Sequence, residues 1–477
     1  MSNHEDVVGA VPSRNLPPVE VRELPEAPTS LRKVIGPGIV AAGVGLASGE
    51  FVLWPYIASQ VGLVLLWGAA VGIVTQWFLN MEIERYTLAT GETVLTGFSR
   101  YGRHWGLFFA LMACFANLWP GWATSSATLL TYVFGGTPTP IAIGILLIIG
   151  ASLTFAPVVY TLMERIQWLK IAAVATLFAV AFAVIVTRDA WVRLPDAVTH
   201  VGQVPPQLGF ALVMGAFAFA GAGGGQNLCQ SNWIRDKGYG MGAYVPRLVS
   251  PVTGEEEAAP STGFIFEPTD ENLRRWRGWW RIANIEQALT FALISFVTIV
   301  ATSLIAYSTA YGRPDLKNSV DFLRVQGDVM SGRVGPWFGT LFWLVGAGSL
   351  FAAAMGIVDY TARLAADTLK TVYLRGAAVT ENRLYFGIVW GLVALGIGVL
   401  AVGFSQPLTL LVTSAVSGGL MMAIYSVLLI RLNARSLPKA IRISGWRIAA
   451  LVWSALLFGF LTYLTFGQQI EKIRTGK

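Results

Sequence analysis

The chain contains eleven runs of mostly apolar residues, each long enough to cross a lipid bilayer as a helix. Hydrophobic residues make up 54% of the chain and charged residues only 13%, whereas roughly a quarter of an average soluble protein is charged. A helix needs about 20 apolar residues to span the hydrocarbon core. The sequence therefore predicts an all-α integral membrane protein with eleven transmembrane helices, at about 34–60, 62–86, 105–134, 140–157, 163–187, 206–233, 282–310, 336–366, 384–404, 406–431 and 446–466.

The loops on the side of the N-terminus carry most of the Lys and Arg residues. Positive residues are retained on the cytoplasmic side of a membrane, so we expect a cytoplasmic N-terminus and, after an odd number of crossings, an external C-terminus. This distribution also explains the net charge of +7 without a nucleic-acid partner. The first residues lack the apolar core of a secretory signal, and the chain fits a bacterial plasma membrane.

The order of the predicted helices divides the chain into four parts. Residues 1–33 are polar and Pro-rich, which favours a disordered cytoplasmic tail. Residues 34–203 (helices 1–5) and 204–434 (helices 6–10) form two groups of opposite orientation, an inverted repeat. The second group carries a cytoplasmic insert at 236–281, and residues 435–477 add helix 11 and a tail.

Several charged residues lie near the predicted membrane edges. Trp and Arg alternate at 274–281, as in segments that anchor at the headgroup layer, although a regulatory or partner surface is an alternative. Asp359 and Arg363, one helical turn apart, fit either a structural ion pair or a relay. Charges that close the second run are expected to be solvated, namely Glu82, Glu84 and Arg85.

Two glycine-rich segments, 43–50 and 221–227, interrupt the first and sixth apolar runs. Breaking a helix in lipid frees backbone N–H and C=O groups, which cost several kcal/mol each unless a partner satisfies them. Interruptions at matching positions of two repeats are typical of the binding site of a secondary transporter. We therefore expect helices 1 and 6 to be broken and the site to lie between them.

Glu50 is the most informative residue at these breaks, because a carboxylate near the middle of a membrane is costly and usually functional. It fits a ligand for a substrate or coupling ion, a structural partner of an Arg or a backbone amide, or a protonated gate. The histidines lie outside the spans, and Cys229 is expected to pack rather than to bind metal. No arrangement in the spans suggests an enzyme.

Several motifs resemble the Nramp divalent-metal transporters, as a divergent Nramp-related branch. They are Gly36-Pro37-Gly38, Ser48-Gly49-Glu50, Arg85-Tyr86 and Thr90-Gly91-Glu92-Thr93. The resemblance implies a LeuT-type 5+5 inverted repeat that moves a divalent metal ion by alternating access. Where the family has Asp-Pro-Gly-Asn in helix 1, this chain has Ala47-Ser48-Gly49-Glu50, and where it has Met-Pro-His-Asn in helix 6, this chain has Gly224-Gly225-Gln226-Asn227.

By this resemblance, Glu50, Asn227 and the carbonyls of Ala47 and Gly221 are the metal ligands. Other residues that would help to bind the substrate are Ser48, Gly224 and Gln226. The family's Asp and Met are replaced, which favours a hard ion such as magnesium or manganese. The family's proton-relay residues are missing, so we expect facilitated or weakly coupled transport. No cofactor is expected, and the oligomeric state stays open. A transporter of a small organic solute and a non-transporting sensor are the alternatives.

Overall fold

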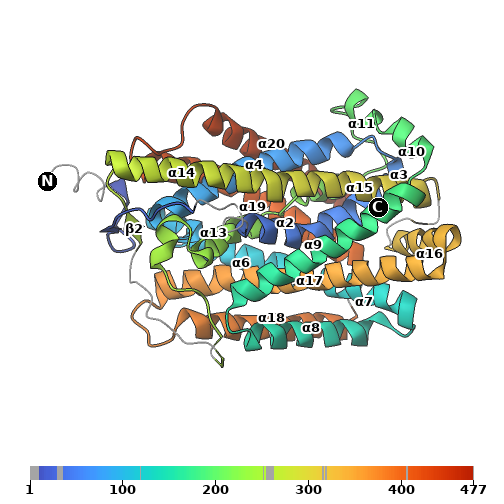
Figure 1. The fold of residues 1–477 in the computed structure, drawn as a ribbon, viewed down its shortest axis with the longest axis horizontal. Helices are drawn as coiled ribbons and strands as arrows, with labels where there is room; N and C mark the ends of the chain where they lie inside the picture. Colours follow the sequence, from blue (N-terminus) through green and yellow to red (C-terminus); the bar gives the residue numbers. More distant parts are fainter. Residues whose placement is uncertain are drawn as a thin grey trace.

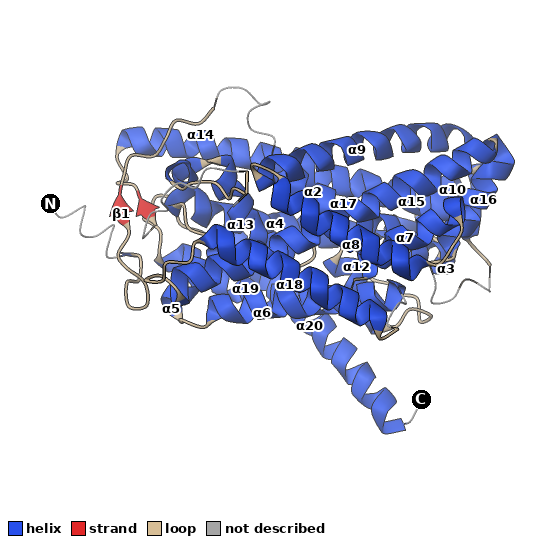
Figure 2. Ribbon diagram, turned by 90° about the horizontal axis from the view of Figure 1, so that it is seen from below, coloured by secondary structure: helices blue, strands red, loops and turns tan. Residues whose placement is uncertain are grey.

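The computed structural model describes residues 10–28, 36–118, 120–250, 252–253, 263–313, 316, 320–403 and 407–475. Its long helices run side by side along one axis and form a bundle (Figure 1). In the described residues the one sheet is a parallel pair of short strands, β1 (Glu20–Val21) and β2 (Phe264–Ile265). Both strands lie at one end of the bundle, here called the strand end; α3, α10 and α16 lie at the opposite end (Figure 2).

The first half of the chain contains the helices α2 (Pro37–Ser48), α3 (Trp54–Val61), α4 (Leu66–Thr90), α5 (Val94–Tyr101), α6 (Trp105–Asn117), α7 (Gly121–Phe134), α8 (Pro138–Phe155), α9 (Val159–Val184), α10 (Arg188–Arg193) and α11 (Asp196–Thr199). The second half contains α12 (Phe210–Ala218), α13 (Gly225–Lys237), α14 (Asp270–Glu286), α15 (Ile294–Ala310), α16 (Phe322–Val334), α17 (Pro336–Thr368), α18 (Glu381–Ala401), α19 (Pro407–Arg435) and α20 (Trp446–Thr475). Three π-helical segments continue helices: η2 (Gly49–Leu53), η4 (Gln287–Leu293) and η5 (Leu369–Tyr373); η3 (Gly240–Tyr244) is a 3₁₀ helix.

The described residues contain nine helical stretches that are long and apolar enough to cross a membrane. Two further segments complete the eleven predicted crossings. The first, α4, is 25 residues long but contains polar residues such as Gln76 and Glu82. The second is divided between α12 and α13, and each of these helices alone is too short. The chain is an integral membrane protein.

Residues 10–28 pack across the strand end, so the expected disorder of the 1–33 tail is wrong for this segment. Four of its side chains are buried: Val11, Leu16, Val19 and Leu24. Strand β1 pairs with β2 of the insert. The insert and α5 supply hydrogen-bond partners that the composition of the tail could not reveal, and Arg100 of α5 donates to Pro12 O and Pro17 O. Residues 1–9 and 29–33 lie outside the described part of the chain.

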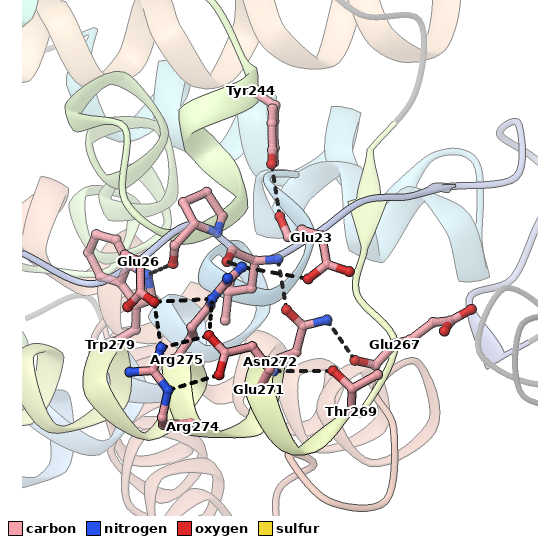
Figure 3. A network of polar contacts seen from close by, with 12 residues as sticks. Glu23, Glu26, Tyr244, Glu267, Thr269, Glu271, Asn272, Arg274, Arg275 and Trp279 are labelled. Atoms are coloured by element: carbon pink, nitrogen blue, oxygen red, sulfur yellow. Dashed lines mark hydrogen bonds and ion pairs between the residues drawn. The ribbon is translucent and has the colours of Figure 1, made fainter.

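Polar side chains of the insert form hydrogen bonds with backbone groups of residues 10–28 (Figure 3). Asn272 Oδ1 accepts a hydrogen bond from Leu24 N at 3.1 Å, and its Nδ2 donates to Glu267 O at 3.0 Å. Trp279 Nε1 donates to Pro25 O at 2.8 Å. The expected headgroup anchor is thus wrong for Trp279, and also for Trp276, because both rings are buried in the protein.

Replacement of Asn272 by Leu is expected to release the N-terminal segment from the insert. The change leaves Leu24 N buried without a partner, at a cost of about 1–3 kcal/mol, and removes one of the two donors to Glu267 O, which still accepts from Thr269 N. Hydrogen exchange of residues 20–25 should accelerate by at least about tenfold. Arg277→Ala, at an exposed position of the same helix, is the matched control. Equal exchange in both variants would contradict this role of Asn272.

Candidate functional site

The interruption of the first helix is a π-helical turn, η2. This turn distorts the helix less than the open backbone that the glycines led us to expect, because the chain stays helical from Pro37 to Val61. Inserted π turns are frequent at functional sites. Glu50 is the second residue of this turn and is fully buried. Ala47 and Ser48 end α2, but their side chains lie outside the described part of the structure.

The sixth helix is broken as predicted. Helix α12 ends at Ala218 and α13 begins at Gly225, with non-helical backbone between them. Gly221 has a φ of 127° and Gly224 a φ of 80°, values that side-chain-bearing residues rarely adopt. The glycines therefore let the chain turn within the membrane.

The two interruptions touch each other directly. A Cβ at Gly49 would lie 1.7 Å from the carbonyl oxygen of Phe219, so only a glycine allows η2 to pack on the break of the sixth helix. A Cβ at Gly224 would lie 2.4 Å from Gly418 O on α19. The structure thus brings the two glycine segments together, and in this conformation they are closely packed.

Gln76 on α4 satisfies the open backbone of the sixth helix, a role that the sequence did not suggest. Its Nε2 is within hydrogen-bond distance of three carbonyls, Phe217 O, Ala218 O and Ala220 O, at 2.9–3.2 Å. Its Oε1 accepts from Ala222 N and Gly223 N at 2.9 and 3.2 Å. One carboxamide therefore lies within hydrogen-bond distance of five backbone groups of the break.

The two predicted amides of α13 already have partners within the protein. Asn227 Oδ1 accepts from Gly224 N at 2.7 Å and so caps α13, while its Nδ2 donates to Asn80 Oδ1 at 2.7 Å. Gln226 Nε2 donates to Ala41 O on α2. None of these contacts joins either amide to Glu50. An ion that used Asn227 would have to displace at least one of these bonds.

Glu50, by contrast, is fully buried without a hydrogen bond of normal geometry. Neither carboxylate oxygen has a hydrogen bond within the described residues. The Ser295 hydroxyl of α15 lies beside it and is also buried without a hydrogen bond of normal geometry. No group of three or more His, Cys, Asp or Glu residues in the described chain is placed to hold a metal. A metal ion here would depend on Glu50 and on neutral oxygens.

Lys170, near the middle of α9, is a second site residue that sequence reasoning missed. Its side chain is buried, and its Nζ donates to Gly43 O on α2. It also lies within electrostatic range of Glu50. A lysine in the interior of a membrane bundle is a signal of function, but a single cation in a long apolar run is easily read as part of the adjoining loop.

The strand end is closed by buried ion pairs. Arg363 binds Asp359 at 2.8 Å and also Asp236, and Arg235 binds Asp367 at 3.0 Å. Asp359 and Arg363 thus form the structural pair that was one of the two interpretations. Three further charges at this end are buried rather than solvated as expected, because α20 and the insert cover them: Glu82, Glu84 and Arg85.

The opposite end contains a cavity of about 1060 Å³ between α3, α12, α19 and α20. None of the described residues that line it is charged. Ser417 lines the cavity and directly precedes Gly418, which packs on Gly224. The cavity therefore extends along α19 to the level of the break in the sixth helix. At the strand end a smaller cavity of about 240 Å³ is lined by charged residues that include Arg235 and Asp367.

Gly49→Ala is expected to separate the two breaks. The new methyl group overlaps the Phe219 carbonyl, and overpacking of this kind costs about 3 kcal/mol or more. The thermal midpoint of the purified protein in detergent should fall clearly. Gly348→Ala is the matched control, because a Cβ at Gly348 meets nothing within 4 Å. Equal midpoints for the two variants would refute the close contact.

Gln76→Met should destabilise the broken helix while preserving side-chain volume. It removes the partner of Ala218 O, Ala220 O, Ala222 N and Gly223 N, while Phe217 O still accepts from Ala220 N. We therefore expect a loss of about 3 kcal/mol or more and faster hydrogen exchange at Ala222 and Gly223. Val74→Met, on an exposed position of α4, controls for the methionine. Unchanged exchange at Ala222 and Gly223 in the Gln76 variant would show that Gln76 does not hold the break.

Comparisons with known proteins agree with this architecture. No protein-family model matches the chain, and no curated protein sequence does. A solved structure of an Eremococcus coleocola manganese transporter with an aromatic bis-isothiourea substituted compound is similar at TM-score 0.69 and 13% identity, covering 97% of this chain and 91% of that one. Two mutants of that transporter give a TM-score of 0.67 at 12% identity, covering 95% of this chain and 90% and 91% of theirs. The chain therefore has the LeuT-type transporter fold that its sequence predicts.

Proposed function

We propose that the protein is a secondary transporter that moves a divalent metal cation by alternating access. The observation that carries this proposal is the fully buried carboxylate of Glu50, whose oxygens have no hydrogen bond of normal geometry to the described residues, at the contact between two interrupted helices. A bare carboxylate in a membrane interior is strongly unfavourable, and a cation is the partner that removes this cost. The fold shared with a manganese transporter supports the same cargo class.

The proposed ligands are Glu50 and the carbonyls of Ala47 and Gly221. Asn227 and Gln226 join them when the break opens, because their present hydrogen bonds close it. Ser48 and Gly224 belong to the same site through oxygen or bound water. Since all of these donors are oxygen atoms, the site favours hard ions such as magnesium or manganese.

The two ends of the bundle have different roles in this cycle. The uncharged cavity gives access from one side, and the ion pairs of Arg363 and Arg235 close the other. We place the strand end in the cytoplasm of a bacterial cell, with the C-terminus outside, because the basic loops lie on the N-terminal side. The cavity then faces outward, and opening the strand end would release the ion into the cell.

Transport by purified protein in liposomes tests this function. Entry of magnesium, manganese and calcium is measured beside a pH-sensitive dye inside the vesicles. Glu50→Gln removes the charged ligand, so metal entry should fall by about 10- to 100-fold. Asp189→Asn, an exposed carboxylate of α10, should transport normally. Absence of metal entry in the parent would overturn the proposal and favour an organic solute or a sensor, and full flux in Glu50→Gln would refute the site.

A further inference from the structure

Lys170 and Glu50 are opposite charges buried in the same region of the membrane bundle. Glu50 lies near the middle of the first span and Lys170 near the middle of α9 (Val159–Val184). Lys170 Nζ contacts α2 through Gly43 O, one to two turns before Glu50. An isolated charge at this depth is costly, and an opposite charge nearby compensates for it. Lys170 is the cation within the described residues that interacts with Glu50.

Three side chains in the helices that pack in this region have buried oxygen atoms without hydrogen bonds. These oxygens belong to Glu50, to Ser295 and to Gln167, whose Oε1 is buried one turn before Lys170 on α9. Gln167 is in turn placed by Nε2, which donates to Ala352 O of α17 at 3.2 Å. Four elements, α2 with η2, α9, α15 and α17, therefore meet at an oxygen-rich cluster. Among the described residues, Lys170 is the basic side chain that acts on Glu50 at this cluster.

We propose that Lys170 is a tethered counter-cation that takes the place of the metal ion whenever the transporter is empty. The proposal rests on the metal-transport function proposed above. With Lys170 beside Glu50 the empty site is neutral. A divalent ion added to this pair would leave a net charge of +2 in a poorly polarisable region, so the ammonium has to move away when the cargo binds. Its four-carbon chain allows this movement.

This role has a consequence for the transport cycle. Net uptake requires the empty protein to change its orientation, whereas exchange of internal for external metal does not. An uncompensated Glu50 carboxylate would oppose the change of the empty protein, because the closed site would enclose a bare charge. Lys170 therefore permits the return of the empty transporter, and it also weakens metal binding by competing for Glu50.

Lys170→Gln separates these effects, since glutamine retains a donor for Gly43 O but carries no charge. In proteoliposomes we expect net manganese uptake to fall by about tenfold or more, while manganese exchange across the membrane stays within about threefold of the parent. Binding of manganese to the purified protein should tighten. Lys170→Arg, which keeps the charge, should retain net uptake. Thermal midpoints of both variants verify that they are folded.

Other outcomes identify which proposal fails. If Lys170→Gln loses uptake and exchange equally, or binds manganese no more tightly than the parent, Lys170 has only a structural role and the counter-cation proposal is overturned. Lys170→Met provides the same test should the glutamine variant not fold. If the parent neither exchanges nor binds manganese, the metal-transport function itself fails. Exchange that survives in Glu50→Gln would contradict the proposed carboxylate partner.

Discussion

An interrupted helix inside a membrane must find partners for its free backbone groups within the protein. In this structure Gln76 provides them for the sixth helix, with one carboxamide joined to three carbonyls and two N–H groups. Gln226 and Lys170 provide donors for carbonyls of α2. Because these side chains come from different helices, the break is tied to the surrounding bundle. The close contact of Gly49 with Phe219 depends on this arrangement.

The same constraint explains why Glu50 differs from its neighbours. The amides at the breaks are used to stabilise open backbone, but the carboxylate of Glu50 is left without a hydrogen bond. An amide is neutral, and its burial costs little once it is hydrogen-bonded. A buried carboxylate without a hydrogen bond is stabilised by a positive charge nearby. In our account, Lys170 compensates for this charge in the empty transporter, and a metal ion does so during transport.

The two ends of the molecule differ in structure: one contains buried ion pairs, and the other contains an uncharged cavity. At the strand end, buried arginine–carboxylate pairs join α13, α17 and α18, and the N-terminal segment binds the insert beside them. At the other end a cavity free of charged lining residues separates the described helices. Opening the strand end thus requires charged pairs to separate, which is costly unless water or new partners reach them.

The sequence was sufficient to predict the helical membrane fold, the eleven crossings and the break at Gly221–Gly224, because apolar length and glycine content are local properties. The carboxylate at Glu50 also stood out from its apolar surroundings. Gln76 and Lys170 could not be assigned in this way, since their roles depend on which backbone groups lie opposite them in the folded bundle. That Asn227, a proposed ligand, also caps α13 in this conformation could not be read from the sequence either. The order of residues 10–28 likewise depends on segments distant in sequence, α5 and the insert.

The position of a bound manganese ion tests the central claim most directly. Crystals of the parent protein grown with manganese can be measured at a wavelength where the metal scatters anomalously. Our account predicts a peak within about 2.5 Å of a Glu50 carboxylate oxygen, between η2 and the break at 219–224, with the Lys170 ammonium withdrawn from Glu50. A peak only among the ion pairs of the strand end, or none at manganese concentrations that saturate transport, would contradict it.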